Sequence, residues 1–250
     1  MSHAGADYLA AQIDRSQALL DRLDREHDQN PRLAELQHWQ RVRLRETYAD
    51  LRARPRFVAA CEFFLEELYG GRDMRMRDQQ LERALPVMRR MLPDHLLHAV
   101  GEALRLQWIS LDFDARLARA LDGPLNQPEY ARGYRRLDDW TGRREQIELI
   151  GELGDLLRRT VRIPMILRLV RWMRRPAHAA GFGTLQEFLE NGLDAFAAMG
   201  EDAKYFVDLI LERETRALER MEQGESWPFH EWIDHGPDEA EFAGQGQADD

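Results

Sequence analysis

The sequence predicts an all-α fold, a multi-helix bundle of about seven to nine helices. Apolar residues recur at three- and four-residue steps through most of the chain, which places them on one face of a helix. No segment alternates apolar and polar residues as a half-buried strand does. Proline and glycine interrupt the periodic segments at intervals, as they do between helices. We therefore expect helices alone, packed around an apolar core.

The most apolar segment predicts a central helix at 57–69. Its main face holds Phe57, Ala60, Cys61, Phe64, Leu65 and Leu68. Phe63 and Tyr69 widen that face, and a helix that is apolar over more than a narrow stripe packs on several sides. Gly70 then ends the helix. Cys61 is the single cysteine, so we expect a buried, inert thiol rather than a nucleophile.

The first half of the chain predicts four further helices, at 6–28, 31–54, 78–91 and 94–121. Pro31 separates the helix at 6–28 from the one at 31–54, and Pro55 separates the latter from the central helix, because a proline in the interior of a helix breaks it. Pro86 interrupts or kinks the helix that contains it.

The loop at 122–128 reads DGPLNQP and is the candidate boundary between two halves, 1–122 and 128–222, of one helical body at 1–222. Beyond it we expect helices at about 129–160, 164–173 and 184–222, the last divided at Gly200. Thr184 and Glu187 have the spacing of a capping box, which predicts the start of that last helix.

Residues 223–250 form an acidic tail that contains no lysine or arginine. The end of this tail, after about residue 243, has the composition of a disordered segment. Its first part contains Trp227, Phe229, Trp232 and Ile233, which are costly to leave in water. We therefore expect residues 226–235 to dock on the body close to the basic segment described next. The alternative is that these aromatics cover an unrelated apolar patch.

The segment 158–175 reads RRTVRIPMILRLVRWMRR and holds seven arginines and no acid. Basic amphipathic segments of this kind bind anionic membrane surfaces or acidic partner proteins. The candidate binding residues are Arg158, Arg159, Arg162, Arg168, Arg171, Arg174 and Arg175. The alternative is a core helix whose arginines pair with acids elsewhere in this acidic chain.

Charged residues in and after the central helix are candidates for a pocket. Glu62 and Glu66 lie one turn apart beside its apolar face, and two crowded carboxylates have pKa values that are pushed apart. Three charged residues follow the central helix, Arg72, Arg77 and Asp78. Together with Tyr69 they can line a pocket. The alternative is that arginines neutralise the two glutamates and that the others form ion pairs and helix caps.

We predict no metal, no other cofactor and no catalytic residue. Glu35 and His38 have the Glu-x-x-His spacing of a di-iron site, but a second such pair is lacking. His95, His98 and Glu102 share one helix face and could hold a metal. A haem site with His38, His95 or His98 as the axial ligand remains an alternative.

Phe63 to Tyr69 read FFLEELY, which resembles the signature of the bacterial FFLEELY-motif proteins. The run from Arg77 to Pro93 is also similar to the sequence that follows the signature there. The resemblance extends over most of residues 30–222. It implies a helical protein of unassigned biochemistry and supplies no catalytic residue.

Composition narrows the classes of function. The formal net charge of −10 argues against a general nucleic-acid binder. No run of eighteen apolar residues is present, and the first residues do not resemble a secretory signal, so we expect a cytoplasmic protein.

The function we expect is non-catalytic binding of another macromolecule. The partner would be an acidic protein, or the chain's own acidic tail on the basic segment. The alternatives are a cofactor- or small-ligand-binding bundle, such as a haem or metal enzyme, and reversible binding to an anionic membrane surface through residues 158–175. The oligomeric state has no signal in the sequence.

Overall fold

The computed structural model describes residues 4–26, 29–68 and 74–233. This part of the chain is helical and contains no strand, which confirms the predicted all-α fold. The elements are α1 (Ala4–Arg25), α2 (Arg32–Thr47), α3 (Ala49–Arg52), α4 (Pro55–Glu62), a π-helical turn η2 (Phe63–Leu68), α5 (Met74–Met91), α6 (Asp94–Ala120), α7 (Gln127–Leu137), α8 (Trp140–Thr160), α9 (Pro164–Ala179), α10 (Gly183–Met199), a 3₁₀ turn η3 (Gly200–Asp202) and α11 (Ala203–Glu222).

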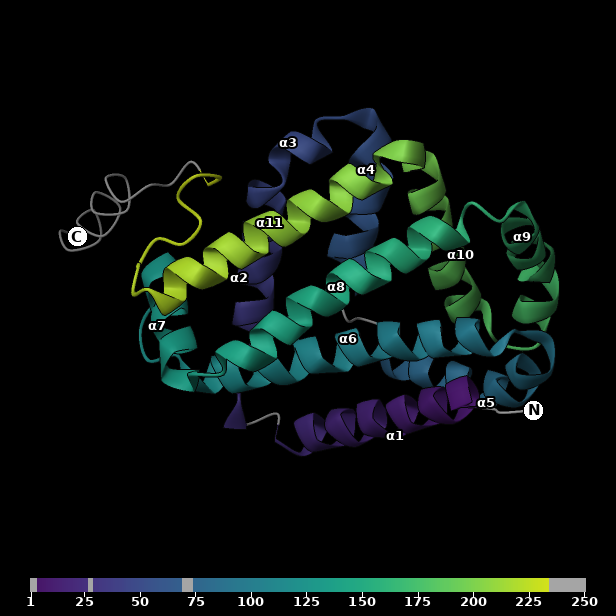
Figure 1. Ribbon diagram of the computed structural model, residues 1–250. Coiled ribbons are helices and arrows are strands. Elements are labelled where there is room, and N and C mark those ends of the chain that lie inside the picture. The colour runs from purple at the N-terminus through teal and green to yellow at the C-terminus, as the bar shows by residue number, and fades with distance from the viewer. Residues whose placement is uncertain (1–3, 27–28, 69–73, 234–250) are drawn as a thin grey trace, which may run out of the picture.

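Helix α6 runs almost the full length of the molecule, with α1 along one side and α8 and α11 crossing on the other (Figure 1). Helices α1 and α6 are parallel, because Asp94 at the start of α6 accepts a bond from the Gly5 amide (2.9 Å) at the start of α1. A Cβ at Gly5 would lie 2.1 Å from the Asp94 carbonyl oxygen, so glycine permits this close approach. Trp108 Nε1 donates to Gln12 Oε1 (3.0 Å) further along the same contact.

The predicted central helix packs against α10 and α11, but its form differs from the prediction. It is α-helical only to Glu62, and η2 follows. The wider π turn changes which residues face inward. Phe63 and Leu65 are buried, whereas Phe64, predicted at the middle of the apolar face, is half-buried.

Two predicted long helices are each divided. The predicted helix at 31–54 separates into α2 and α3 at Tyr48. The one at 129–160 separates into α7 and α8, because Asp138 adopts a left-handed conformation (φ 50°) and Asp139 caps α8 through the Gly142 amide (3.2 Å). Helices α5 and α9 instead continue through Pro86 and Pro176.

The predicted capping box is wrong. Thr184 is the second residue of α10, and its hydroxyl lies 3.5 Å from the Met76 sulfur. The Leu185 amide donates instead to Gln80 Oε1 of α5 (2.9 Å). The start of α10 is therefore capped by a side chain from a different helix.

The first part of the tail packs on the body, but not beside the basic segment. Phe229 and Ile233 are buried against α2, α7 and α11, and the Phe229 amide donates to Gln127 Oε1 (3.0 Å). This site lies at the opposite end of the molecule from α9 (Figure 1). The alternative is the one observed, because Phe229 and Ile233 pack on an apolar patch that is unrelated to the basic segment. Residues 234–250, and with them the expectation for the last residues, lie outside the described residues.

Candidate functional site

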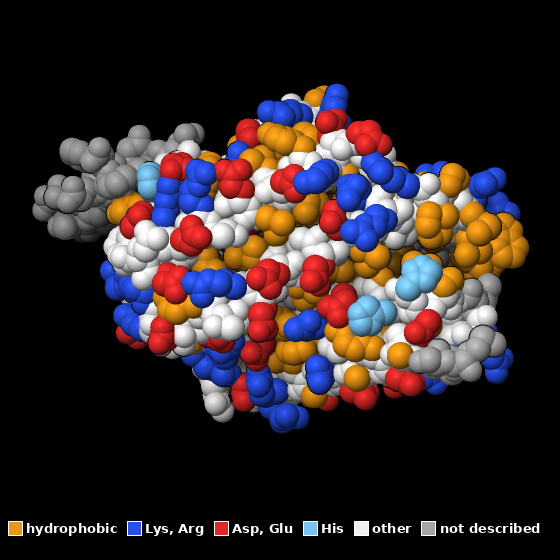
Figure 2. Space-filling view, viewed as in Figure 1, with side chains coloured by type: hydrophobic (Ala, Val, Ile, Leu, Met, Phe, Trp, Pro, Cys, Tyr) orange, Lys and Arg blue, Asp and Glu red, His pale blue; other side chains and the backbone are white. Residues whose placement is uncertain are grey.

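Helix α9 carries most of the predicted basic segment and is the least covered helix of the body. It packs against α10 at one end of the molecule (Figure 1). Ala177 is buried, while its other side chains are exposed or half-buried. Met165 and Trp172 are 70% and 71% exposed. In the space-filling view, apolar side chains gather at that end (Figure 2). A large apolar side chain in water is costly, so this surface is a candidate binding site.

The exposed apolar residues share one face of α9 with two arginines. Met165, Arg168, Trp172 and Arg175 follow one another at steps of three and four residues, which aligns them along the helix. Arg168 Nε lies 3.4 Å from the Pro164 carbonyl oxygen, which can accept its hydrogen bond. Within the described ranges, neither Arg168 nor Arg175 lies within ion-pair distance of a carboxylate. We call these four residues the outer face of α9.

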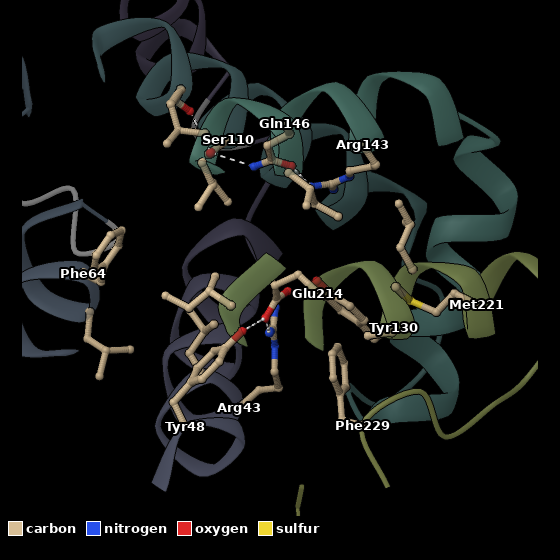
Figure 3. A pocket seen from close by; sticks show the side chains of 18 of the residues that line it. Arg43, Tyr48, Phe64, Ser110, Tyr130, Arg143, Gln146, Glu214, Met221 and Phe229 are labelled. Carbon is tan, nitrogen blue, oxygen red and sulfur yellow. Dashed lines mark hydrogen bonds and ion pairs between the residues drawn. The ribbon is translucent and has the colours of Figure 1, made fainter. Parts of the chain in front are cut away.

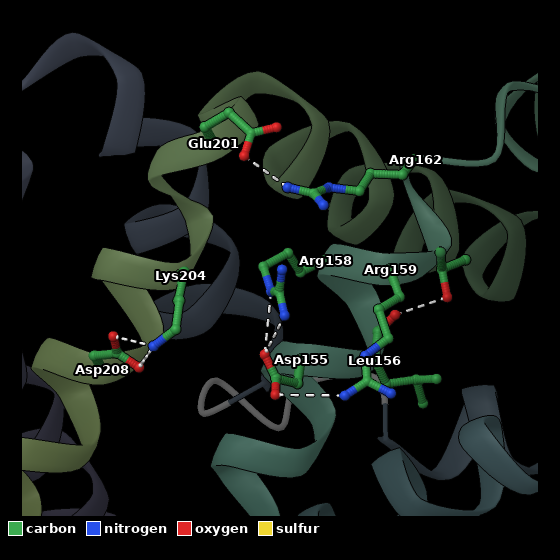
Figure 4. A network of polar contacts seen from close by, with 9 residues as sticks. Asp155, Leu156, Arg158, Arg159, Arg162, Glu201, Lys204 and Asp208 are labelled. Atoms are coloured by element: carbon green, nitrogen blue, oxygen red, sulfur yellow. Dashed lines mark hydrogen bonds and ion pairs between the residues drawn. The ribbon is translucent and has the colours of Figure 1, made fainter.

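The other five predicted arginines are paired with acids of the chain. Asp155 lies between Arg158 (3.0 Å) and Arg159 (3.8 Å), and Arg162 reaches Glu201 (2.7 Å) (Figure 4). The remaining pairs bind α9 to α10: Arg171 with Asp194 (2.6 Å) and Arg174 with the buried Glu190 (2.5 Å). The predicted surface of seven arginines is thus divided, and the structural alternative holds for these five.

Glu62, Arg77 and Asp78 are the pocket candidates whose side chains the structure describes, and they contact different helices. Glu62 pairs with Arg52 (3.2 Å). Arg77 and Asp78 are buried where α5 meets α1 and α10. The Arg77 guanidinium lies 4.5 Å from the centre of the Phe188 ring, and Asp78 accepts a bond from the Ser16 hydroxyl (2.5 Å). Burial raises the pKa of Asp78 to about 6. Both residues therefore sit in helix packing.

The side chain of Glu66 and the residues Tyr69 and Arg72 lie outside the described residues. The Cys61 thiol is buried, and burial raises its pKa to about 11. At that pKa the thiol is protonated at neutral pH, which agrees with an inert structural residue.

A cavity of about 150 Å³, partly open to solvent, lies between α2, α6, α8 and α11 (Figure 3). Two arginines and a glutamate line it, Arg43, Arg143 and Glu214, together with a mainly apolar wall. Cys61, Phe64 and Leu65 are the part of the central segment that reaches it. The charged pocket candidates that the structure describes, Glu62, Arg77 and Asp78, do not line this cavity. The available sequence signal was a set of polar residues within helices, such as Gln107 and Arg143, and it was missed.

The histidines considered for haem or metal are surface residues. His38, His95 and His98 are exposed, and the His98 ring stacks on Tyr8 at 4.5 Å. In the described part of the chain, no group of three or more His, Cys, Asp or Glu side chains is arranged to hold a metal. Likewise, no helix of the described residues is long and apolar enough to cross a membrane.

Fold and surface together define an all-α domain in which the arginine-bearing helix α9 is largely exposed. The chain belongs to the family whose model is described as a domain of unknown function, DUF8198, which matches residues 19–228. The matched region includes α9, every residue that lines the cavity except Phe229, and the beginning of the docked tail. No curated protein and no solved structure matches the chain.

Proposed function

We propose that this chain is a non-catalytic binding protein that holds an acidic, aromatic segment of a partner protein on the outer face of α9. The observation that carries the proposal is a second arginine-bearing helix in the same molecule. Helix α11 has the same arrangement of arginines, and there the chain itself supplies the acidic, aromatic cover.

On α11, Arg213, Arg216 and Arg220 are spaced by three and four residues. Trp232 of the tail lies over all three guanidinium groups, with its ring centre 5.8, 6.0 and 5.5 Å away. Contacts at this range are cation–π interactions. Glu231 pairs with Arg216 (2.8 Å) and with Arg220.

On α9, Arg168, Arg171 and Arg175 repeat that spacing. One arginine in each set is held by an acid of a neighbouring helix, Arg171 by Asp194 (2.6 Å) and Arg213 by Asp50 (2.8 Å). The other two arginines of α11 have Glu231, whereas those of α9 have no such acid among the described residues.

This parallel supports a partner with the chemistry of the tail: a carboxylate that bridges two arginines one helix turn or two apart, next to an aromatic ring. Charge complementarity favours such a segment. The exposed Trp172 adds apolar area for the partner's ring, since tryptophan dominates binding energy at many protein interfaces.

The direct test uses a fluorescein-labelled peptide with the sequence of residues 223–250. A control peptide has all eight acidic residues replaced by their amides. We expect anisotropy to report salt-sensitive binding of the acidic peptide to the full chain and none of the control peptide. The double variant Arg168→Glu/Arg175→Glu should lose binding at least about tenfold, because like charges then face each other.

The matched control variant is Arg83→Glu/Arg90→Glu, an exposed arginine pair with the same seven-residue spacing on α5. It should bind the peptide normally. Equal binding by both double variants would contradict the proposal. A dimer of the full chain that disappears when residues 224–250 are deleted would instead make the occupant a second copy.

A membrane surface is the second candidate, because Met165 and Trp172 are exposed beside Arg168 and Arg175, which have no carboxylate partner among the described residues. Vesicles of phosphatidylglycerol and phosphatidylcholine test it by sedimentation. If the chain sediments with these vesicles and ignores the peptide, the membrane alternative replaces the protein partner.

We infer two finer points about identity. The family match includes residues 63–69 and 77–93, which supports the inference that DUF8198 members and the bacterial FFLEELY-motif proteins are one group. An alignment of members without FFLEELY at those positions would contradict it. We also propose a cytoplasmic location, which cell fractionation with an antibody against this chain would test.

A further inference from the structure

The π-helical turn η2, Phe63–Leu68, lies beside the cavity. Phe64 and Leu65 of this turn belong to the lining, and Figure 3 shows Phe64 across the space from Tyr130 and Met221. A π turn is rare in proteins, and where it occurs it is frequently part of a functional site. The turn is the first of two observations that point to a bound molecule here.

Gln107 of α6 is the second observation. It lines the cavity and is 8% exposed, and its side-chain nitrogen has no hydrogen-bond partner among the described residues. A buried donor without an acceptor is unfavourable, so such a group in a native protein requires an explanation. An acceptor on a molecule in the cavity supplies it. Because a carboxamide both donates and accepts, a hydroxyl group, which does the same, matches it.

The two arginines of the lining are engaged with the protein. Arg43 pairs with Glu214 (2.6 Å) and lies 4.5 Å from the centre of the Phe229 ring. Arg143 donates to Gln146 (3.0 Å) and lies over two aromatic rings, 4.1 and 4.5 Å from their centres. A charged ligand would lose hydration on entering and would have to compete with these contacts for a partner. The lining therefore favours a neutral molecule.

The apolar wall favours an aromatic body. Phe64 and Phe206 both line the cavity, and their ring centres are 5.6 Å apart. Aromatic rings pack favourably with one another in offset or edge-to-face arrangements. The volume of about 150 Å³ is that of an engineered apolar cavity that binds benzene. One ring with a small substituent therefore fits.

We propose that this cavity binds a small neutral aromatic molecule with a hydroxyl group, a phenol or aromatic alcohol of up to about ten non-hydrogen atoms. The hydroxyl oxygen accepts the hydrogen bond of Gln107, and the ring packs against Phe64 and Phe206. The open side of the cavity is the entry path. The described lining residues come from elements other than α9, so this site goes beyond the binding function proposed above.

The probes are 4-fluorophenol and 4-fluorotoluene, observed by ¹⁹F NMR with the full-length chain. They differ by a hydroxyl in place of a methyl group, so their affinity ratio reports the polar contact. Water also solvates the hydroxyl, and the decisive quantity is therefore the change of this ratio between the parent chain and a variant. A third probe, 4-fluorobenzoate, carries a charge and should bind at least about tenfold more weakly than 4-fluorophenol.

The key variant is Gln107→Leu, which removes the donor and keeps a side chain of similar size. We expect the preference for 4-fluorophenol over 4-fluorotoluene to fall about tenfold, because the bound hydroxyl then lacks its partner. Thermal unfolding of the variant should match or exceed that of the parent chain. The matched control is Gln79→Leu, the same change at an exposed position of α5, which should leave the ratio unchanged.

A second variant locates the probes. Ala217 of α11 lines the cavity and is 1% exposed, so Ala217→Leu places a larger side chain in the space and should abolish binding of both neutral probes. Gln107→Leu keeps the test decisive if Ala217→Leu does not fold.

Three results would overturn the proposal. The first is no saturable binding of 4-fluorophenol at millimolar concentration, which would assign the cavity to water. The second is an unchanged affinity ratio in Gln107→Leu, which would remove the hydrogen bond to Gln107. The third is equal or tighter binding of 4-fluorobenzoate, which would show that the site does not select a neutral molecule.

Discussion

Helices α11 and α9 carry arginines at the same spacing, but the part of the chain that the structure describes covers the arginines of α11 and leaves α9 exposed. Over α11 lie Glu231 and Trp232 of the tail, and behind them Phe229 and Ile233 are buried. Over α9 no segment of the described chain lies, and Trp172 is 71% exposed. We propose that similar local sequences serve two purposes, cohesion within the chain at one end and contact with a partner at the other.

The largest change in unfolding free energy should come from a substitution under the tail on α11, and not from one on the exposed face of α9. Phe229→Ala removes a side chain that is 1% exposed, and such cavities cost about 3–5 kcal/mol of unfolding free energy. Trp172→Ala should change it by less than about 0.5 kcal/mol, as is usual for exposed positions. Urea denaturation of both variants makes the comparison. Equal losses would mean that Trp172 is buried in solution and α9 is not open.

A smaller change in unfolding free energy should come from replacing Glu129 of α7, the helix against which the tail packs. Burial alone would raise the pKa of Glu129, but bonds from the Asp122 amide (2.8 Å), Arg132 (2.9 Å) and Arg136 (3.0 Å) hold it at about 2. Glu129→Gln should cost about 1–3 kcal/mol at pH 7, the usual range for hydrogen bonds to charged groups.

The sign of the pH dependence of Glu129 follows from its lowered pKa. Its contribution is fully present above its ordinary pKa of 4.5 and is lost as pH falls toward 2. The parent chain should therefore lose more stability than Glu129→Gln between pH 5 and pH 2. Parallel curves of unfolding free energy against pH would remove the role given to this carboxylate.

Asp78, at the contact of α1 and α5, should show the opposite sign. Its folded-state pKa of about 6 lies above the ordinary 3.8, so its ionisation opposes folding. Its contribution is most favourable below pH 4 and is lost as pH rises through 6. Asp78→Asn keeps an acceptor for Ser16 and should stabilise the chain by on the order of 1 kcal/mol at pH 7 and by less at pH 4. Destabilisation at pH 7 would show that the charge is needed there.

The smallest effect should be that of Glu231→Gln. Hydrogen bonds from Arg216 and Arg220 lower the pKa of Glu231, but the side chain is 37% exposed. Exposed ion pairs of this kind contribute about 0.5 kcal/mol. Denaturation at low and high salt should show the difference shrinking as salt screens it. A loss comparable to that of Phe229→Ala would mean that charge, not aromatic burial, holds the tail.

Helical periodicity predicted most of the fold, because the apolar spacing of a helix is a local property. The division at Asp138 escaped prediction, because a left-handed aspartate between two helices leaves no trace in the spacing of apolar residues. The cap of α10 by Gln80 escaped it as well, because the two residues are 105 positions apart along the chain.

The candidate sites were predictable only in part. The basic segment was visible as an excess of arginine, but which arginines remain open depends on acids of α10 such as Glu190 and Asp194. The cavity left only an indirect signal, polar residues such as Gln107 and Arg143 within helices, because its lining comes from helices that are distant in sequence. The destination of the tail was mispredicted, because charge was given more weight than the burial of Phe229.

Hydrogen exchange of the full-length chain, with and without the peptide of residues 223–250, tests directly whether the peptide binds on the outer face of α9. Because the chain's own tail already covers α11, we expect the peptide to slow exchange in α9, residues 164–179, and to leave exchange in α11 unchanged. Slowed exchange in α11 alone, or no change in either helix with peptide bound, would contradict the assignment of α9 as the open binding face.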